Sequence, residues 1–257
     1  MDELSVAARS LIPLLRDIPR VDEQVSVTRQ KLLDWDFVLS RDSTEASLYV
    51  SWRRRLGEAV YKVVVPTEVQ AYIGRVSTKR LIDWLVAPDG RFGADPIAAR
   101  DAMLVDSLAV ALEDLEKRFG TTDMTRWQYG SEQFKHATIR HPMSGAVNED
   151  LRRQLDVGPL PRGGYGDTVH NTGGNDNQSS GASFMIITDT ESWDNSVGLS
   201  SPGQSGDPDN PHYRDLFELW ARDRYFPIFF SRTKIDSVVE STTLLTPTAD
   251  TAAATNP

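Results

Sequence analysis

The feature that most constrains the fold is a long amphipathic stretch before the middle of the chain, DPIAARDAMLVDSLAVALEDLEKRFG. Its apolar residues recur at helical spacing on a common face: Ile97, Met103, Val105, Leu108, Leu112 and Leu115. Asp95 is suited to be the N-cap, and Pro96 is suited to the first helical position. Gly120 is suited to follow the last turn of the helix. The sequence therefore predicts one long helix between Asp95 and Gly120.

Three further segments before Gly120 have helical patterns. In RDSTEASLYVSWRRRLGEAVYKVV, Asp42 and Glu45 are spaced as a capping box in front of an apolar stripe. The segments VTRQKLLDWDFVL and STKRLIDWLV also predict helices, and we expect Trp35 and Trp84 to anchor the core. The basic run Arg53 to Arg55 spreads around its helix, which favours a solvated face.

The helical pattern is lost after Gly120. The stretch GPLPRGGYGDTVHNTGGNDNQSSGAS has the composition of a flexible linker, but it leads directly into the apolar run Phe184 to Ile187. That run predicts a strand buried on both faces, so we expect an ordered loop over residues 160–182. SWDNSVGLSS and RYFPIFFSR predict further extended segments, the second at a sheet edge because of Pro227.

These patterns divide the chain into three parts. Residues 1–120 are predicted to be mainly helical, residues 121–245 to hold the glycine-rich loop and the strands, and residues 246–257 to form a disordered tail. A net charge of −9 argues against sequence-independent nucleic-acid binding. No apolar stretch approaches a membrane span, and the acidic first residues do not resemble a signal peptide. The absence of cysteine excludes disulfides and thiolate metal sites.

One candidate site lies in the segment PGQSGDPDNPHY. Ser205 is disfavoured as a nucleophile because Asp207 stands where the nucleophile elbow needs a second glycine. His212 follows Asp207 and Asp209, which suggests a metal or an acid–base pair, but acidic residues also collect where helices begin. We therefore favour capping, with Asn210 as the N-cap of a helix that begins at the following proline.

The other three histidines give no clear site. His136 and His141 are five residues apart, which does not match the i, i+4 pairing of a helical zinc site, and IRHPM predicts the end of a helix at His141. His170 lies in the glycine-rich loop, where the sequence identifies no partner for a general base. Its role is left open.

The second half of the chain resembles the C-terminal end of the penicillin amidase family, the N-terminal-nucleophile amide hydrolases that include penicillin, cephalosporin and acyl-homoserine lactone acylases. The resemblance rests on these motifs: SGASF at Ser180–Phe184, Asp189, Trp193–Asp194, PGQSGDP at Pro202–Pro208, PHY at Pro211–Tyr213, and YFPIFFSR at the end. Weaker resemblance through RHPM and LLDWD extends to the whole chain, which is similar to the last part of the family's large β subunit.

The resemblance implies a fold of the α+β class. Family members have an αββα sandwich of two stacked antiparallel sheets flanked by helices, with a helical insertion. Residues 1–120 would represent that insertion, and the strand-rich half would complete the sandwich.

The resemblance also implies an activity, hydrolysis of linear amide bonds such as the acyl side chain of a β-lactam or an acyl-homoserine lactone. The family's nucleophile is an N-terminal serine whose own amine serves as the base, whereas this chain begins Met1-Asp2. The serine, the oxyanion-hole asparagine and the calcium ligands are therefore expected upstream. No catalytic, cofactor-binding or metal-binding residue is assigned to the chain, and the chain alone is expected to be inactive.

The expected partners are the upstream portion of the acylase, comprising the α subunit and the N-terminal part of the β subunit, and a small acyl amide substrate. No nucleic acid or membrane partner is expected. Family members are typically periplasmic or secreted, but the sequence itself assigns no localisation. An alternative is a non-catalytic binding or scaffold protein derived from an acylase.

Overall fold

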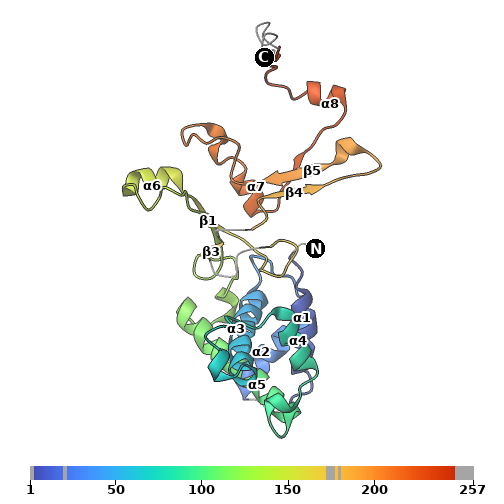
Figure 1. The fold of residues 1–257 in the computed structure, drawn as a ribbon, viewed down its shortest axis with the longest axis vertical. Helices are drawn as coiled ribbons and strands as arrows, with labels where there is room; N and C mark the ends of the chain where they lie inside the picture. Colours follow the sequence, from blue (N-terminus) through green and yellow to red (C-terminus); the bar gives the residue numbers. More distant parts are fainter. Residues whose placement is uncertain (1–2, 20–21, 172–176, 179–180, 247–257) are drawn as a thin grey trace, which may run out of the picture.

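The computed structural model describes residues 3–19, 22–171, 177–178 and 181–246. Figure 1 shows two parts: helices α1 to α5 gather in one, while the strands and the shorter helices α6 and α7 lie in the other. The N-terminus lies near the junction of the two parts, although the rest of the N-terminal half belongs to the helical part. Segments distant in sequence therefore meet at this junction.

The helical part is built around the packing of α3 against α5. Its helices are α1 (Val6–Leu11), α2 (Glu23–Asp34), α3 (Thr44–Val64), α4 (Thr78–Val86) and α5 (Pro96–Phe119). Trp52 of α3 is fully buried, and its indole N–H donates to the carbonyl oxygen of Leu104 in α5 at 2.9 Å. Buried aromatic residues that follow α5 extend this core: Trp127, Tyr129, Phe134 and Tyr165.

The ends of α5 confirm the predicted helix. The Asp95 side chain accepts from the N–H of Ala98 at 3.0 Å, and Gly120 has a left-handed φ of 65°. The predicted apolar face is only partly correct. Ile97 is 59% exposed because the buried residues of α5 begin about two turns later, at Leu104.

Helix α3 begins one residue later than the sequence predicted. Ser43, and not Asp42, is the N-cap, and its hydroxyl accepts from the N–H of Ala46 at 3.0 Å. Two core tryptophans were predicted nearby. Trp35 is buried, whereas Trp84 is half-buried and lies under the Arg91 guanidinium at 4.7 Å.

The prediction of a solvated face for the basic run of α3 is wrong for Arg53, although the side chain of Arg55 is 39% exposed. The side chain of Arg53 is only 13% exposed, and its Nη2 lies 3.3 Å from an oxygen of Asp167 in the glycine-rich loop. Arg55 pairs with Asp114 of α5 at 2.5 Å and with Glu58 at 2.9 Å. These arginines point toward carboxylates on neighbouring segments, which the helix pattern alone does not reveal.

A small sheet follows the helical part. Its strands are β1 (His136–Ile139), β2 (Val157–Pro161) and β3 (Asn177–Gln178), in the order β2-β1-β3, and α6 (Glu149–Leu155) lies between β1 and β2 in sequence. The predicted helix ending at His141 is therefore wrong. The segment before it is a strand because buried Ala137 pairs with Leu160 of β2, and that pairing outweighs the weak helical pattern.

A second antiparallel sheet contains the three predicted extended segments. Its strands are β4 (Phe184–Ile187), β5 (Val197–Ser200) and β6 (Phe226–Pro227), in the order β4-β5-β6. Pro227 lies on an edge strand, as predicted. The expected burial of β4 on both faces is wrong, because Phe184, Ile186 and Ile187 are 58%, 52% and 54% exposed on a strand at the opposite edge.

A second, smaller core contains residues of both sheets and of the segment that follows β5. It is formed by Ala137, Val157, Leu199, Tyr213, Phe217, Trp220 and Ala221. Asn210 caps the next segment as predicted, accepting from the N–H of His212 at 2.8 Å. The predicted helix is divided, however, into a single 3-10 turn over Pro211–Tyr213 and the short helix α7 (Phe217–Ala221). The last helix, α8 (Arg232–Asp236), projects away from both cores (Figure 1).

Some predictions concern residues outside the described part. Residues 172–176 and 179–180 of the predicted ordered loop, and residues 247–257 of the predicted tail, belong to this group. Among the described residues, no helix is both long enough and apolar enough to span a bilayer.

The position of the α3 cap gives a direct test. Ser43→Ala removes the acceptor for the Ala46 N–H and should lower the free energy of unfolding by about 1 kcal/mol. Asp42→Ala should change it by less than about 0.5 kcal/mol, because the Asp42 side chain makes only an exposed pair with Arg41. Urea unfolding of both variants measures the difference, and a larger loss for Asp42→Ala would show that the capping box was correct.

Candidate functional site

The four histidines occupy different environments. His136 lies in β1, and its Nδ1 is buried without a hydrogen-bond partner among the described residues. His141 follows that strand, and its Nδ1 accepts from the N–H of Met143 at 3.1 Å. His212 is exposed and pairs with Asp215 at 2.8 Å rather than with either aspartate before it. Only His170 is fully buried.

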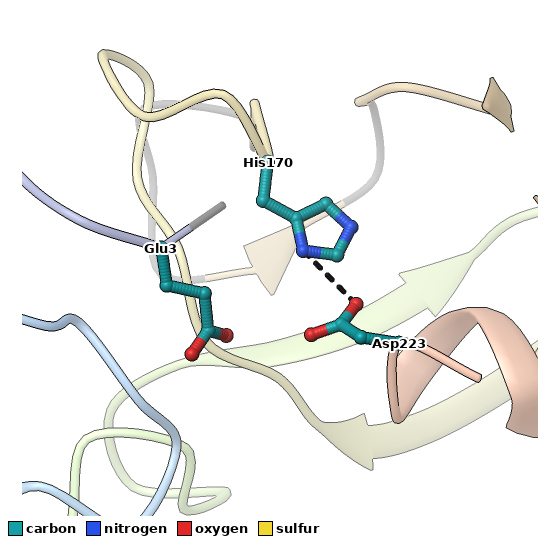
Figure 2. A group of neighbouring side chains, drawn as sticks. All are labelled: Glu3, His170 and Asp223. Atoms are coloured by element: carbon teal, nitrogen blue, oxygen red, sulfur yellow. Dashed lines mark ion pairs between the residues drawn. The ribbon is translucent and has the colours of Figure 1, made fainter. Parts of the chain in front are cut away.

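His170 lies in a compact cluster of charged side chains at the junction of the two parts of the chain. Its Nδ1 is 2.9 Å from Oδ1 of Asp223, as Figure 2 shows, but the ring N–H is not aligned for a hydrogen bond. Its Nε2 contacts Nη2 of Arg162. The cluster therefore joins three places in the chain. Arg162 directly follows β2, His170 lies in the glycine-rich loop, and Asp223 lies two residues after the end of α7.

Arg162 is the centre of this cluster. Its side chain is completely buried, its Nη1 lies 3.2 Å from Asp223 and donates to the carbonyl oxygen of Trp220, and its guanidinium lies 3.8 Å from the centre of the Trp220 ring. Burial of an arginine is unfavourable unless its charge is paired. Asp223 supplies this negative charge, and its own backbone lies in the left-handed region with a φ of 56°.

Glu3 completes the cluster from the N-terminal segment. Its carbonyl oxygen accepts from the N–H of Leu39 at 3.0 Å. Only glycine fits at position 163, because an added Cβ would lie 2.6 Å from the backbone carbonyl oxygen of Leu39 and would also meet the Glu3 carboxylate. Burial raises the pKa of Glu3 from 4.5 to about 7, and the negative charge of Asp223 adds to the effect. Near neutral pH this carboxyl is therefore only partly ionised.

Glu3, His170 and Asp223 have the composition of a metal site, because one ligand atom from each lies within 4.8 Å of the others. The hydrogen-bond chemistry does not fit a metal ion. Arg162 can only donate, so Nε2 of His170 must accept and the ring proton must be on Nδ1, the atom that faces Asp223. A metal at Nδ1 would need the opposite tautomer. The cluster is therefore a buried ion network.

The segment of Ser205 forms a self-contained loop. Its hydroxyl accepts from the N–H of Asp207 at 3.1 Å, and the N–H groups of Gln204 and Ser205 both donate to the carbonyl oxygen of His212. A Cβ on Gly203 would collide with that same backbone. Glycine at position 203 therefore allows the loop to pack closely on the Pro211–Tyr213 turn. The Ser205 hydroxyl stabilises the loop through its hydrogen bond with Asp207.

The aspartates of the motif around Trp193 also hold the backbone. Asp189 accepts from the N–H groups of Glu191 and Ser192 at 2.9 and 3.0 Å. Asp194 accepts from the N–H groups of Phe230 and Ser231 at 2.8 Å each, and its hydrogen bonds with Ser231 lower the pKa of its carboxyl. These contacts tie the β4–β5 turn to the segment after β6.

Sequence reasoning found His170 but not its partners. Arg162, Asp223 and Glu3 are 8, 53 and 167 residues away from it, and each lies in an ordinary sequence context. Local spacing carries no signal for such a cluster. The glycine pair after Arg162 is the only local clue, because Gly163 is where Glu3 must fit.

The comparisons with known proteins agree with the motifs. The sequence profile described as penicillin amidase matches residues 1–237. The chain is 27% identical over 255 residues to the acyl-homoserine lactone acylase QuiP of Pseudomonas aeruginosa, covering 88% of the chain and 30% of that protein. It is 27% identical over 218 residues to a penicillin acylase 2 proenzyme of Pseudomonas sp. strain SE83, covering 80% and 27%.

A solved structure supports the fold. The chain is similar to a thermostable penicillin G acylase from Alcaligenes faecalis with a TM-score of 0.55 and 20% identity, covering 96% of the chain and 47% of the acylase chain. Together these matches define an acylase-type hydrolase family and an α+β fold. The chain belongs to the penicillin amidase family, as its motifs predicted, and it spans about 30% of the length of the curated relatives.

The raised pKa of Glu3 predicts how stability depends on pH. The folded protein favours the protonated carboxyl, so this contribution is complete below about pH 4.5 and is lost as the pH rises through about 7. Glu3→Gln keeps the shape without the charge. It should raise the free energy of unfolding at pH 8 by about 1–2 kcal/mol, discounted because the carboxyl is partly solvated, and by much less at pH 5.

Urea unfolding at pH 5, 6, 7 and 8 measures this effect, with Glu68→Gln, an exposed acid on the helical part, as the control. If the difference between Glu3→Gln and the unmodified chain stays constant over these pH values, the carboxyl is not held in the environment described.

Proposed function

We propose that this chain is the C-terminal portion of a penicillin amidase-type hydrolase that cleaves linear amide bonds, with an N-terminal serine outside these 257 residues as the nucleophile. The observation that carries the proposal is the uneven coverage: the match includes 88% of this chain but only 30% of the QuiP acylase. The remaining portion would supply the serine, the oxyanion hole and the calcium site. The substrate would be an acyl amide.

The described hydroxyl groups support this division of roles. None of the four described histidine rings has a serine or threonine hydroxyl as a hydrogen-bond partner. A hydroxyl nucleophile needs an adjacent base, either a side chain or its own terminal amine. Among the described residues no histidine is therefore placed to activate an internal serine or threonine, which supports the proposal of an N-terminal serine.

The second sheet supports assembly with an upstream portion. Strand β4 is at the edge of its sheet and exposes apolar side chains on both faces, those of Phe184, Ile186 and Ile187. An apolar edge strand is a template for further strands, and its exposure in water promotes aggregation. In the proposed enzyme, strands of the upstream portion would continue the sheet at β4 and cover these side chains.

Reconstitution tests the activity. The chain alone should hydrolyse no phenylacetyl, glutaryl or long-chain acyl amide, whereas its complex with the upstream portion of a family acylase should turn over at least one of them. Turnover by the purified chain alone, abolished by a single internal serine or histidine substitution, would refute the proposed nucleophile. A stable complex without turnover would favour the binding or scaffold alternative.

A matched pair of substitutions tests the assembly surface. Ile186→Lys places a charge on the exposed strand β4 and should prevent co-purification with the upstream portion. Ile97→Lys makes the same change at a similarly exposed isoleucine of α5, 59% against 52% exposed, and should leave co-purification intact. Equal yields of complex from the two variants would rule out β4 as the docking edge.

A further inference from the structure

Two aromatic rings meet at the surface of the strand-rich part, at the end of the β4–β5 hairpin. Trp193 lies in the turn that joins β4 to β5, Phe230 lies three residues after β6, and their ring centres are 4.8 Å apart. Trp193 is 55% exposed and Phe230 is 65% exposed. By contrast, the stacked rings of Phe217 and Trp220 are buried in the second core. The Trp193–Phe230 pair therefore presents apolar area that the described chain does not cover.

The backbone that carries the two rings is fixed by hydrogen bonds. Asp194 directly follows Trp193, and its Oδ1 accepts from the N–H groups of Phe230 and Ser231 at 2.8 Å each. The turn and the segment after β6 are therefore tied together at the position of the rings. An aromatic side chain that is already held in place loses little conformational freedom when a partner covers it. Such a side chain is suited to anchor an interface.

The pair continues the exposed apolar residues of β4 along the chain. Phe184, Ile186 and Ile187 are each more than half exposed, and Ile187 is the last residue of β4, before the turn that carries Trp193. A single exposed apolar side chain is ordinary on a protein surface, whereas a group of large ones marks an interaction site. Here the group lies on one hairpin and on the segment that is tied to it.

The length of the relatives indicates which partner covers this group. The match to the QuiP acylase includes 88% of this chain but only 30% of that protein, so most of a full-length relative lies outside these 257 residues. The proposed extension of the sheet at β4 would bring the upstream portion beside the turn that carries Trp193. Tryptophan is among the residues that contribute most binding energy at protein interfaces.

We propose that Trp193 and Phe230 together anchor the interface with the upstream portion of the enzyme by inserting into an apolar pocket on it. Asp194 is a positioning residue that holds the Phe230 backbone beside the turn of Trp193. The identity of the partner rests on the proposed function. The anchor is nevertheless separate from the docking edge, because the backbone of β4 can pair with a further strand whether or not these two rings are covered.

The affinity for the upstream portion of the QuiP acylase tests the anchor. Trp193→Ala and Phe230→Ala should each weaken the complex at least about tenfold, whereas Trp193→Phe keeps an aromatic ring and should bind within about threefold of the unmodified chain. Both positions are more than half exposed, so the variants should fold, which urea unfolding checks. Tyr72→Ala is the control, because it truncates an 86% exposed aromatic residue of the helical part and should leave the affinity unchanged.

Amide hydrogen exchange tests the positioning role of Asp194. Asp194→Ala removes the acceptor for two N–H groups, so the amides of Phe230 and Ser231 should exchange faster and the complex should weaken. Asp194→Asn keeps a side-chain oxygen and should restore slow exchange and most of the affinity. If Asp194→Ala leaves both the exchange rates and the affinity unchanged, Asp194 does not position Phe230.

The anchor and the proposed assembly fail in different ways. The anchor alone is overturned if the unmodified chain forms the complex and Trp193→Ala and Phe230→Ala bind equally well, or if Tyr72→Ala weakens the complex as much as they do. It is also overturned if the amides of residues 188–196 and 226–231 gain no protection in the complex.

The proposed assembly itself is refuted if the unmodified chain does not bind the upstream portion, and the anchor is then refuted with it. A dimer of the unmodified chain that Trp193→Ala dissociates would also overturn the proposal, because it would assign the two rings to a contact between copies of this chain.

Discussion

The burial of one guanidinium group, that of Arg162, organises the junction of this protein. A fully buried arginine needs a counter-charge and hydrogen-bond acceptors. Asp223 supplies the negative charge, and the acceptors are the carbonyl oxygen of Trp220 and the ring of His170 in the glycine-rich loop. Glu3 brings the N-terminal segment to the same place. The two hydrophobic cores have no residue in common, and this polar contact is one of the links between them.

The sequence predicted local structure well where one segment decides it. The caps at Asp95 and Asn210, the left-handed Gly120 and the edge position of Pro227 follow from backbone chemistry within a few residues. The prediction from sequence failed where a residue distant in the chain decides the local structure. The strand beginning at His136 depends on pairing with β2, and the burial of Arg53 depends on the glycine-rich loop, so neither is visible in the local pattern.

The candidate sites show the same division. His170 was noticed because histidine is chemically distinctive, but its environment is made by residues that look ordinary in sequence. The apolar run of β4 correctly predicted a strand, and its expected burial is missing within the described chain.

The two edges of the second sheet have opposite chemistry. One edge ends in β6, where Pro227 has no N–H to offer to a further strand, and the other ends in β4, whose apolar residues are exposed. The sheet can therefore be extended in one direction only. This polarity makes the far end of the segment after β6 the safer position for a fused tag or reporter, whereas an attachment near β4 would obstruct the edge that is open to a further strand.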